Sequence, residues 1–298
     1  DGSAADQGSD SGESSDLGPE LDMGDDAAVV LDQGGPVIEI AFRGVLGDQD
    51  VACGTEYSGF GASGDQAVRI KDFRFYVHDV ELIRDDAQVV PLTLLDEAPF
   101  QRAGVALLDF ENKTSDCVNG TAAMRSVVRG TAPDGNYVGV RFVLGVPLDQ
   151  NHQDRSIAAA PLDLTQLFWS WAGGYIFARF DLMAVSGTAA GNTPATFSVH
   201  LGSTACNGSP ATMPSTSCTY PNRPVITLMD FDPATDVVLV DPKPVVQGID
   251  LTVNTPATAI GCMAARNDPE CTLVMPRLGV EFDSVPGMQV LFRVAEQP

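Results

Sequence analysis

The sequence has few basic residues and no long apolar run. Its 298 residues include 17 Lys and Arg against 40 Asp and Glu, which gives a formal net charge of −23. Proteins that bind nucleic acid hold phosphates through Lys and Arg, and anionic lipid surfaces attract polybasic segments, so we expect neither partner. No apolar run approaches the roughly 18 to 20 residues that span a bilayer, and we expect no transmembrane segment.

The motifs of several enzyme classes are also missing. No GxGxxG follows an expected strand, and no GxxxxGK[ST], HExxH or GxSxG pattern occurs; these patterns mark dinucleotide, phosphate-loop, zinc-protease and hydrolase sites. The six cysteines are even in number and include no CxxC pair. That usage favours disulfides in an oxidising compartment over zinc or iron–sulfur ligation. We therefore expect an exported protein whose signal peptide has been removed.

Sequence neighbours give the simplest pairing of these cysteines, although sequence alone leaves other connectivities open. The pairs would be Cys53 with Cys117, Cys206 with Cys218, and Cys262 with Cys271. Each such staple contributes roughly 2 to 4 kcal/mol, mainly by restricting the unfolded chain.

Residues 1–34 differ in composition from the rest of the chain. They hold eight Asp and two Glu, no Lys or Arg, and many Gly and Ser residues. Such a segment buries too little apolar surface to offset the entropy lost on ordering. We expect a disordered acidic tether at 1–34, to which a lipid anchor is one possible attachment, followed by one folded domain at 35–298.

Short runs with period-two alternation begin after residue 35. In 71–82, for example, Phe73, Phe75 and Val77 share one face of an extended chain, and the residues between them share the other. Turn residues separate these runs, and only 104–110 and 155–168 leave room for helix. The pattern predicts an all-β fold, a mainly antiparallel sandwich or barrel with long loops and little helix. The expected strands are 37–42, 71–82, 138–144, 176–182, 197–201, 225–228, 237–240, 272–274 and 289–294.

Histidine and tryptophan are scarce, and their positions suggest a site. His78 and His200 fall on the polar faces of expected strands, and His152 lies in a loop rich in Asp and Asn. Imidazole binds copper, zinc, iron and nickel alike. Trp169 and Trp171 are the only tryptophans, and at i and i+2 in an extended segment both rings point the same way. A core aromatic pair and a sugar-stacking platform are both open interpretations of that pair.

Five segments in one order resemble a known family. They are NHQD (151–154), PLDLTQLFWSWAGGYIF (161–177), HLGSTAC (200–206), PNRP (221–224) and GCM…DPEC (261–271). This series is similar to the MbnP-like family, the four-Cys, WxW proteins of metallo-mystery pairs that accompany a MauG-like di-haem enzyme. The four-Cys motif falls on Cys206, Cys218, Cys262 and Cys271, which leaves Cys53 and Cys117 as an additional pair.

The resemblance implies a periplasmic or surface copper-binding protein and not an enzyme. The di-haem partner oxidises a WxW tryptophan, here Trp169 or Trp171, to kynurenine, which then helps to bind copper as Cu(I) or Cu(II). His200 and His152 match motif histidines, and His78 is a third candidate ligand. Asp79 and Asp154 are candidates to orient imidazoles, and Met263 is a candidate soft ligand whose alternative role is core packing.

Two other classes stay open at this point. A carbohydrate-binding or adhesive domain would use the tryptophans as a stacking platform and the histidines as structural residues. A metal-dependent enzyme would hold zinc or iron through the three histidines. The implied role, copper storage, uptake or delivery, predicts instead that copper binding depends on the tryptophan modification.

Overall fold

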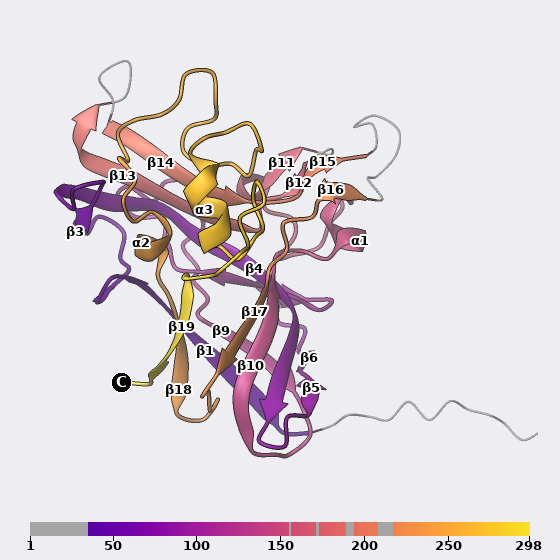
Figure 1. Ribbon diagram of the computed structural model, residues 1–298. Coiled ribbons are helices and arrows are strands. Elements are labelled where there is room, and N and C mark those ends of the chain that lie inside the picture. Colours follow the sequence, from indigo (N-terminus) through magenta and orange to yellow (C-terminus); the bar gives the residue numbers. More distant parts are fainter. Residues whose placement is uncertain (1–34, 155, 171–172, 189–193, 208–216) are drawn as a thin grey trace, which may run out of the picture. The chain divides into compact units, whose positions relative to one another are not determined.

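The computed structural model describes residues 35–298 apart from 155, 171–172, 189–193 and 208–216 (Figure 1). The expected tether, 1–34, therefore lies outside the described residues, as does Trp171. Among the residues that the structure describes, no helix is long and apolar enough to cross a membrane.

One sheet contains the first and the last strands of the domain. Its strand order is β19-β18-β1-β9-β6, with β2 paired to β1. β1 runs parallel to β18 and antiparallel to β9. The strands are β1 (Val37–Leu46), β2 (Gln49–Asp50), β6 (Thr93–Leu94), β9 (Val127–Thr131), β18 (Asp236–Val240) and β19 (Phe292–Glu296).

A second, larger sheet carries two of the predicted histidines, His78 and His200. Its strand order is β14-β13-β4-β10-β17, with β3, β5 and β8 beside β4 and β7 beside β8. All of its pairings are antiparallel. The strands are β3 (Tyr57–Phe60), β4 (Gln66–Arg84), β5 (Val89–Pro91), β7 (Gln101–Arg102), β8 (Val105–Asp109), β10 (Tyr137–Leu144), β13 (Ala178–Thr188), β14 (Pro194–Leu201) and β17 (Val225–Met229).

Aromatic rings join the two sheets face to face. Phe42 of β1 meets Phe75 of β4 and Phe142 of β10, with ring centroids 6.0 and 5.8 Å apart. Phe292 of β19 meets the same two rings at 5.6 and 5.2 Å. Edge-on aromatic pairs of this kind add to the free energy gained from burying their apolar area. The predicted antiparallel sandwich with little helix is confirmed.

Two small two-stranded sheets and four short helical segments complete the domain. Figure 1 shows the small sheets and the first helix gathered in one region. The small sheets are β11 (Phe168–Ser170) with β12 (Gly174–Tyr175), and β15 (Thr204–Cys206) with β16 (Cys218–Tyr220). The helical segments are α1 (Leu148–Asn151), η1 (Thr165–Leu167), α2 (Pro242–Val245) and α3 (Cys271–Arg277).

Three disulfides staple the domain. They join Cys53 to Cys117, Cys206 to Cys218, and Cys262 to Cys271. The pairing expected from sequence neighbours is confirmed.

Two of the expected segments are wrong. Residues 272–274 were expected as a strand but lie in the helix α3, which begins at Cys271; three residues are too few to show a period. Residues 104–110 were left as room for helix but contain β8, whose five residues are all buried against β4. A fully buried strand is apolar on both faces and shows no alternation.

Candidate metal centre

The polar face of the larger sheet is where β4 and β14 place the predicted histidines. Alternation puts Arg74, Tyr76 and His78 of β4 on the face opposite Phe73 and Phe75, as expected. That polar face is buried: Arg74 is fully buried and His78 is only 5% exposed. Groups buried to this degree need partners for their charges.

A distant part of the chain covers this face. The Tyr76 hydroxyl donates to the Pro161 carbonyl at 2.9 Å, and the Tyr175 hydroxyl donates to the carbonyl of Leu162. Arg179 Nη1 donates to the Gln166 carbonyl at 2.7 Å. These bonds tie residues 161–166 across β4 and β13, so the segment that leads into β11 is held over the polar face.

His200 of β14 is held by a carboxylate on the neighbouring strand. Its Nε2 lies 2.8 Å from Asp181 Oδ1, and both residues are at least 95% buried. Nδ1 of the same ring is buried without a hydrogen-bond partner among the described residues. Burial alone would raise the pKa of Asp181, but the contact with His200 and the charge of Arg179 outweigh it and lower that pKa.

Arginines continue this network along the sheet. Arg179 Nη2 lies 2.7 Å from Asp181 Oδ2 and its Nε lies 3.2 Å from Asp72 Oδ2. Asp72 also accepts a 2.7 Å hydrogen bond from Nε of Arg74. The carboxylate of Asp181 is therefore fixed on one side by Arg179 and presents its other oxygen to His200.

The Trp169 ring lies next to the end of β14. A Cβ at Gly202 would lie 2.5 Å from Cζ3 and 2.8 Å from Cη2 of Trp169. The six-membered ring thus occupies the space that a side chain at position 202 would need. The ring therefore lies against Gly202, which is two residues beyond His200 and directly follows the last residue of β14. The half-buried Trp169 is packed against the backbone and is no open stacking platform.

The motif segments meet around the end of β14. Asn222 of PNRP donates to the Gly202 carbonyl at 2.8 Å, and Ser203 Oγ donates to the Pro221 carbonyl at 2.8 Å. Five segments that are far apart in the sequence thus share one neighbourhood.

Cys262 brings the last motif to the edge of β14. Its amide donates to the Ser198 carbonyl and its carbonyl accepts from the His200 amide, as part of a parallel bridge to Val199. Met263, the next residue in the chain, is half-buried. The expected soft ligand therefore directly follows a residue whose backbone bonds to that of His200.

His78 has a different environment. Its Nδ1 lies 3.0 Å from Asp79 Oδ2, so the expected orienting carboxylate is beside the ring, and its Nε2 is buried without a hydrogen-bond partner among the described residues. Burial lowers the pKa of His78, and the charge of Asp79 offsets this only in part. The ring is therefore favoured in its neutral form, which is the form that binds metals.

Strand register separates His78 from His200. His200 pairs with Arg179, and Arg179 pairs with Arg74, while His78 is four residues farther along β4. With about 3.3 Å per residue and 4.8 Å per strand, the two Cα atoms are about 16 Å apart. An imidazole nitrogen reaches about 5 Å from its Cα and a metal bond adds about 2 Å, so one ion cannot reach both rings.

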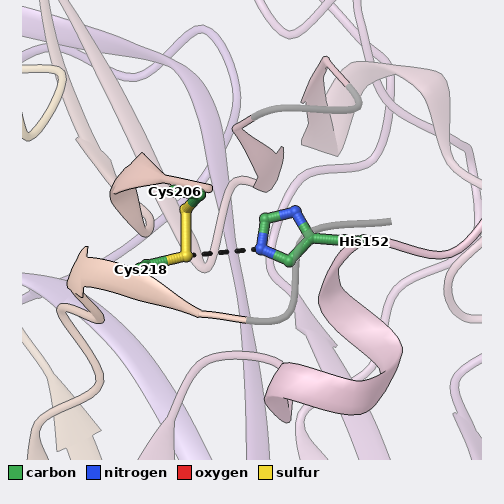
Figure 2. A group of neighbouring side chains, drawn as sticks. All are labelled: His152, Cys206 and Cys218. Carbon is green, nitrogen blue, oxygen red and sulfur yellow. Dashed lines mark hydrogen bonds between the residues drawn. A yellow bond between two sulfur atoms is a disulfide. The ribbon is translucent and has the colours of Figure 1, made fainter. Parts of the chain in front are cut away.

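His152, at the end of α1, lies against a disulfide. Its Nε2 is 3.4 Å from Sγ of Cys218 and 3.0 Å from Nδ2 of Asn151. Figure 2 shows the ring directed at the Cys206–Cys218 bond. Asn151 is held in turn by the Tyr175 amide, which donates to its Oδ1 at 2.8 Å.

Gly174 leaves room for this arrangement. Its φ is +72°, and a Cβ there would lie within 2.6 Å of three atoms of the Asn151 amide. The second glycine after WSW is therefore required both by its backbone conformation and by the close approach of Asn151. It connects the NHQD segment to the strand pair that carries Trp169.

Two groups of three potential metal ligands occur among the described residues. They are His152 with Cys206 and Cys218, and Glu111 with Cys53 and Cys117. Each contains one disulfide, whose sulfurs are not the thiolates that bind metals. The three histidines therefore do not form the single cluster that the sequence suggested.

Asp154, an expected orienting carboxylate, bonds to a residue of its own loop. Asp154 Oδ1 accepts bonds of 2.9 and 2.6 Å from the amide and hydroxyl of Ser156. Asp181 was missed by the sequence analysis, although a charged residue within the apolar segment 176–182 was a usable signal.

The group around His200 fits copper chemically. Imidazole and thioether are ligands that copper accepts, and metal-binding histidines commonly donate their second ring N–H to a carboxylate. Asp181 supplies that acceptor and leaves Nδ1 of His200 for a metal, with Met263 and Trp169 nearby. The donor types present here are therefore ones that copper accepts.

Comparisons with known proteins agree with this arrangement. A solved structure of MbnP from Methylosinus trichosporium is similar, with a TM-score of 0.75 and 28% sequence identity over 88% of this chain and 99% of that chain. The comparison with curated proteins finds no match. A sequence model described as MbnP matches residues 35–264, which is most of the chain. The chain therefore belongs to the MbnP family.

Proposed function

We propose that this chain is an exported copper-binding protein that serves copper storage, uptake or delivery, with its copper held by His200 and a kynurenine made from a WxW tryptophan. The observation that carries the proposal is the His200 imidazole, whose Nε2 is held by Asp181 while its buried Nδ1 has no partner among the described residues. The Trp169 ring lies against Gly202, two residues beyond His200 in the sequence.

The unmodified tryptophan is a poor ligand. Indole offers an N–H donor and no good lone pair. Ring opening inserts two oxygen atoms from an oxidant such as dioxygen across the C2–C3 bond, and hydrolysis then releases C2 as formate. The product carries an aryl amine and a ketone, both of which have lone pairs. The modification therefore creates a donor near His200.

The chain is the substrate in this chemistry and a MauG-like di-haem enzyme is the catalyst. The proposal assigns no catalytic residue to this chain. Trp169 lies in a small two-stranded sheet and packs against the hydrophobic core, but it is only half-buried, and this partial exposure suits electron transfer to a docked partner. The three disulfides support an oxidising, extracytoplasmic location.

The ligand set follows the geometry. Nδ1 of His200 would hold copper, Asp181 would orient the ring, and Met263 would supply a thioether that favours Cu(I). His78 is too far along the sheet to share the ion with His200. It therefore serves as a matched control: it is also a buried histidine beside a carboxylate.

The test compares two preparations of the protein, one produced with the di-haem enzyme and one produced alone. Peptide mass spectrometry of the segment that holds Trp169 and Trp171 should show, in the first preparation only, the mass of tryptophan plus O₂ minus CO at one position. Copper binding should appear with the modification, fall at least tenfold in His200→Ala and stay in His78→Ala.

Two results would contradict the proposal. Two intact tryptophans in the co-produced protein, with the haem enzyme shown to be active, would remove the kynurenine. Copper affinity that is lost in His78→Ala and kept in His200→Ala would move the site to β4.

A further inference from the structure

The disulfide beside His152 differs from the other two disulfides in its exposure. Cys206 and Cys218 are both partly exposed. Cys262 and Cys271 are fully buried, and although Cys53 is partly exposed, its partner Cys117 is fully buried. Because thiol–disulfide exchange requires a thiolate to reach a sulfur atom, a reductant in solution should open the Cys206–Cys218 bond first.

Reduction would leave three metal-binding groups facing one another. One nitrogen of His152 and the two sulfurs all lie within 4.8 Å of one another, and Nε2 is 3.4 Å from the Cys218 sulfur. In a three-coordinate site with metal–sulfur bonds of about 2.3 Å and metal–nitrogen bonds of about 2.0 Å, neighbouring ligand atoms are about 3.7 to 4.0 Å apart. Only the two sulfurs have to separate.

We propose that the Cys206–Cys218 pair, once reduced, forms with His152 a second copper(I) site that has two thiolate ligands and one imidazole ligand. It is independent of the copper site at His200. Figure 2 shows the imidazole directed at the sulfurs. Thiolate ligands favour Cu(I) among the copper oxidation states.

The surrounding structure holds these ligands in place. Cys206 and Cys218 are directly paired residues of β15 and β16, so both side chains leave the small sheet on the same side. Asn151 is fully buried, and its amide covers Nε2 of His152 at 3.0 Å. In the oxidised protein the imidazole is thus positioned but capped, and copper would take the place of the amide.

The chemistry balances with a dithiol as reductant. The donor's two thiols become a disulfide, while two electrons and two protons pass to the sulfurs of Cys206 and Cys218. Copper enters as Cu(I) and stays Cu(I), and it displaces one proton from each thiol. Reoxidation of the pair would release the ion, so the thiol state of this hairpin would control the copper load.

The experiment uses the full chain with all other residues intact. Limited treatment with dithiothreitol, followed by iodoacetamide and peptide mass spectrometry, should show alkylation at Cys206 and Cys218 and at no other cysteine. Titration against the copper(I) chelator bathocuproine disulfonate should then show one more bound Cu(I) per chain than in the oxidised protein.

Variants separate this site from the one at His200. His152→Ala keeps the disulfide and should lower the copper affinity of the reduction-dependent site at least tenfold. At metal sites, loss of a residue that only hydrogen-bonds to a ligand already lowers affinity by roughly 10- to 100-fold. Cys206→Ala/Cys218→Ala should abolish it. His200→Ala should keep it, so failure of the His200 site leaves this result unchanged.

Three outcomes would overturn the inference. They are equal copper loads in reduced and oxidised protein, undiminished uptake in His152→Ala, and alkylation of all six cysteines at once. Tighter binding of Zn(II) than of Cu(I) by the reduced pair would overturn its assignment to copper.

Discussion

The indole of Trp169 fills the space in front of Gly202, where an added Cβ would lie 2.5 Å from Cζ3 of the ring. Gly202→Ala should therefore move the ring or strain the backbone, and we expect a loss of about 1 to 3 kcal/mol in the free energy of unfolding. Urea unfolding measures this loss.

The control for this prediction is a double-mutant cycle. In a Trp169→Ala background the same glycine substitution meets no ring and should cost less, since neighbouring residues couple. Equal costs in the two backgrounds would show that Trp169 does not press on position 202.

Asp181 should act on copper through His200. Asp181→Asn removes the charged acceptor of the 2.8 Å contact, so the ring loses its fixed orientation, and copper affinity should fall about 10- to 100-fold. A copper titration gives the affinity.

Asp72→Asn is the matched control. Asp72 is fully buried on the same face and pairs with Arg74 and Arg179, but not with His200. It should lower stability without a comparable loss of copper affinity. The same loss of copper affinity in both variants would assign a general structural role to these carboxylates.

Met263 should favour Cu(I) over Cu(II). Met263→Leu keeps the volume of the side chain, so the unfolding free energy should change by less than about 1.5 kcal/mol. Affinity for Cu(I) should fall about tenfold, at the low end for groups at a metal site, with Cu(II) affinity nearly unchanged. Equal affinities for both ions in the variant and the parent would leave Met263 as a packing residue.

Asp109 should make stability depend on pH. Burial raises its pKa to about 8, so the folded protein keeps a proton that the unfolded chain loses near its ordinary value of 3.8. This contribution is fully present below the unfolded pKa and is lost as pH rises through about 8. Unfolding free energies measured between pH 5 and 9 should therefore decline more steeply in the parent than in Asp109→Asn.

The exposed Asp86 provides the comparison for this effect. Asp86→Asn is the same change in an exposed surface turn and controls for the general effect of removing one carboxylate. An unchanged slope in Asp109→Asn would mean that Asp109 ionises normally despite its burial.

Alternation was enough to predict the two faces of β4. Phe73 and Phe75 lie in the aromatic core and Arg74 lies on the other face, as period two requires. The burial of that second face could not be predicted, because it is covered by residues 161–166, which come from another part of the chain. Because the two segments are far apart in the sequence, no local pattern reveals that they are in contact.

The motifs predicted which segments gather at the end of β14, because Trp169, Asn222 and Cys262 each contact the stretch 198–202. The distances among His78, His152 and His200 depend on strand register and on the path of the chain, which no local pattern contains. Asp181 was missed because its importance depends on its 2.8 Å side-chain contact with His200 on the neighbouring strand.

Segments that are far apart in the sequence come together at the end of β14, and this determines when in folding the surroundings of His200 can form. His200 acquires its neighbours only when residues near 169, 222 and 262 have docked beside it, so an unfolded chain contains no such pocket. Contacts of this sequence separation form late and slowly. Under the proposed function, copper can therefore bind at His200 only after these segments have folded together.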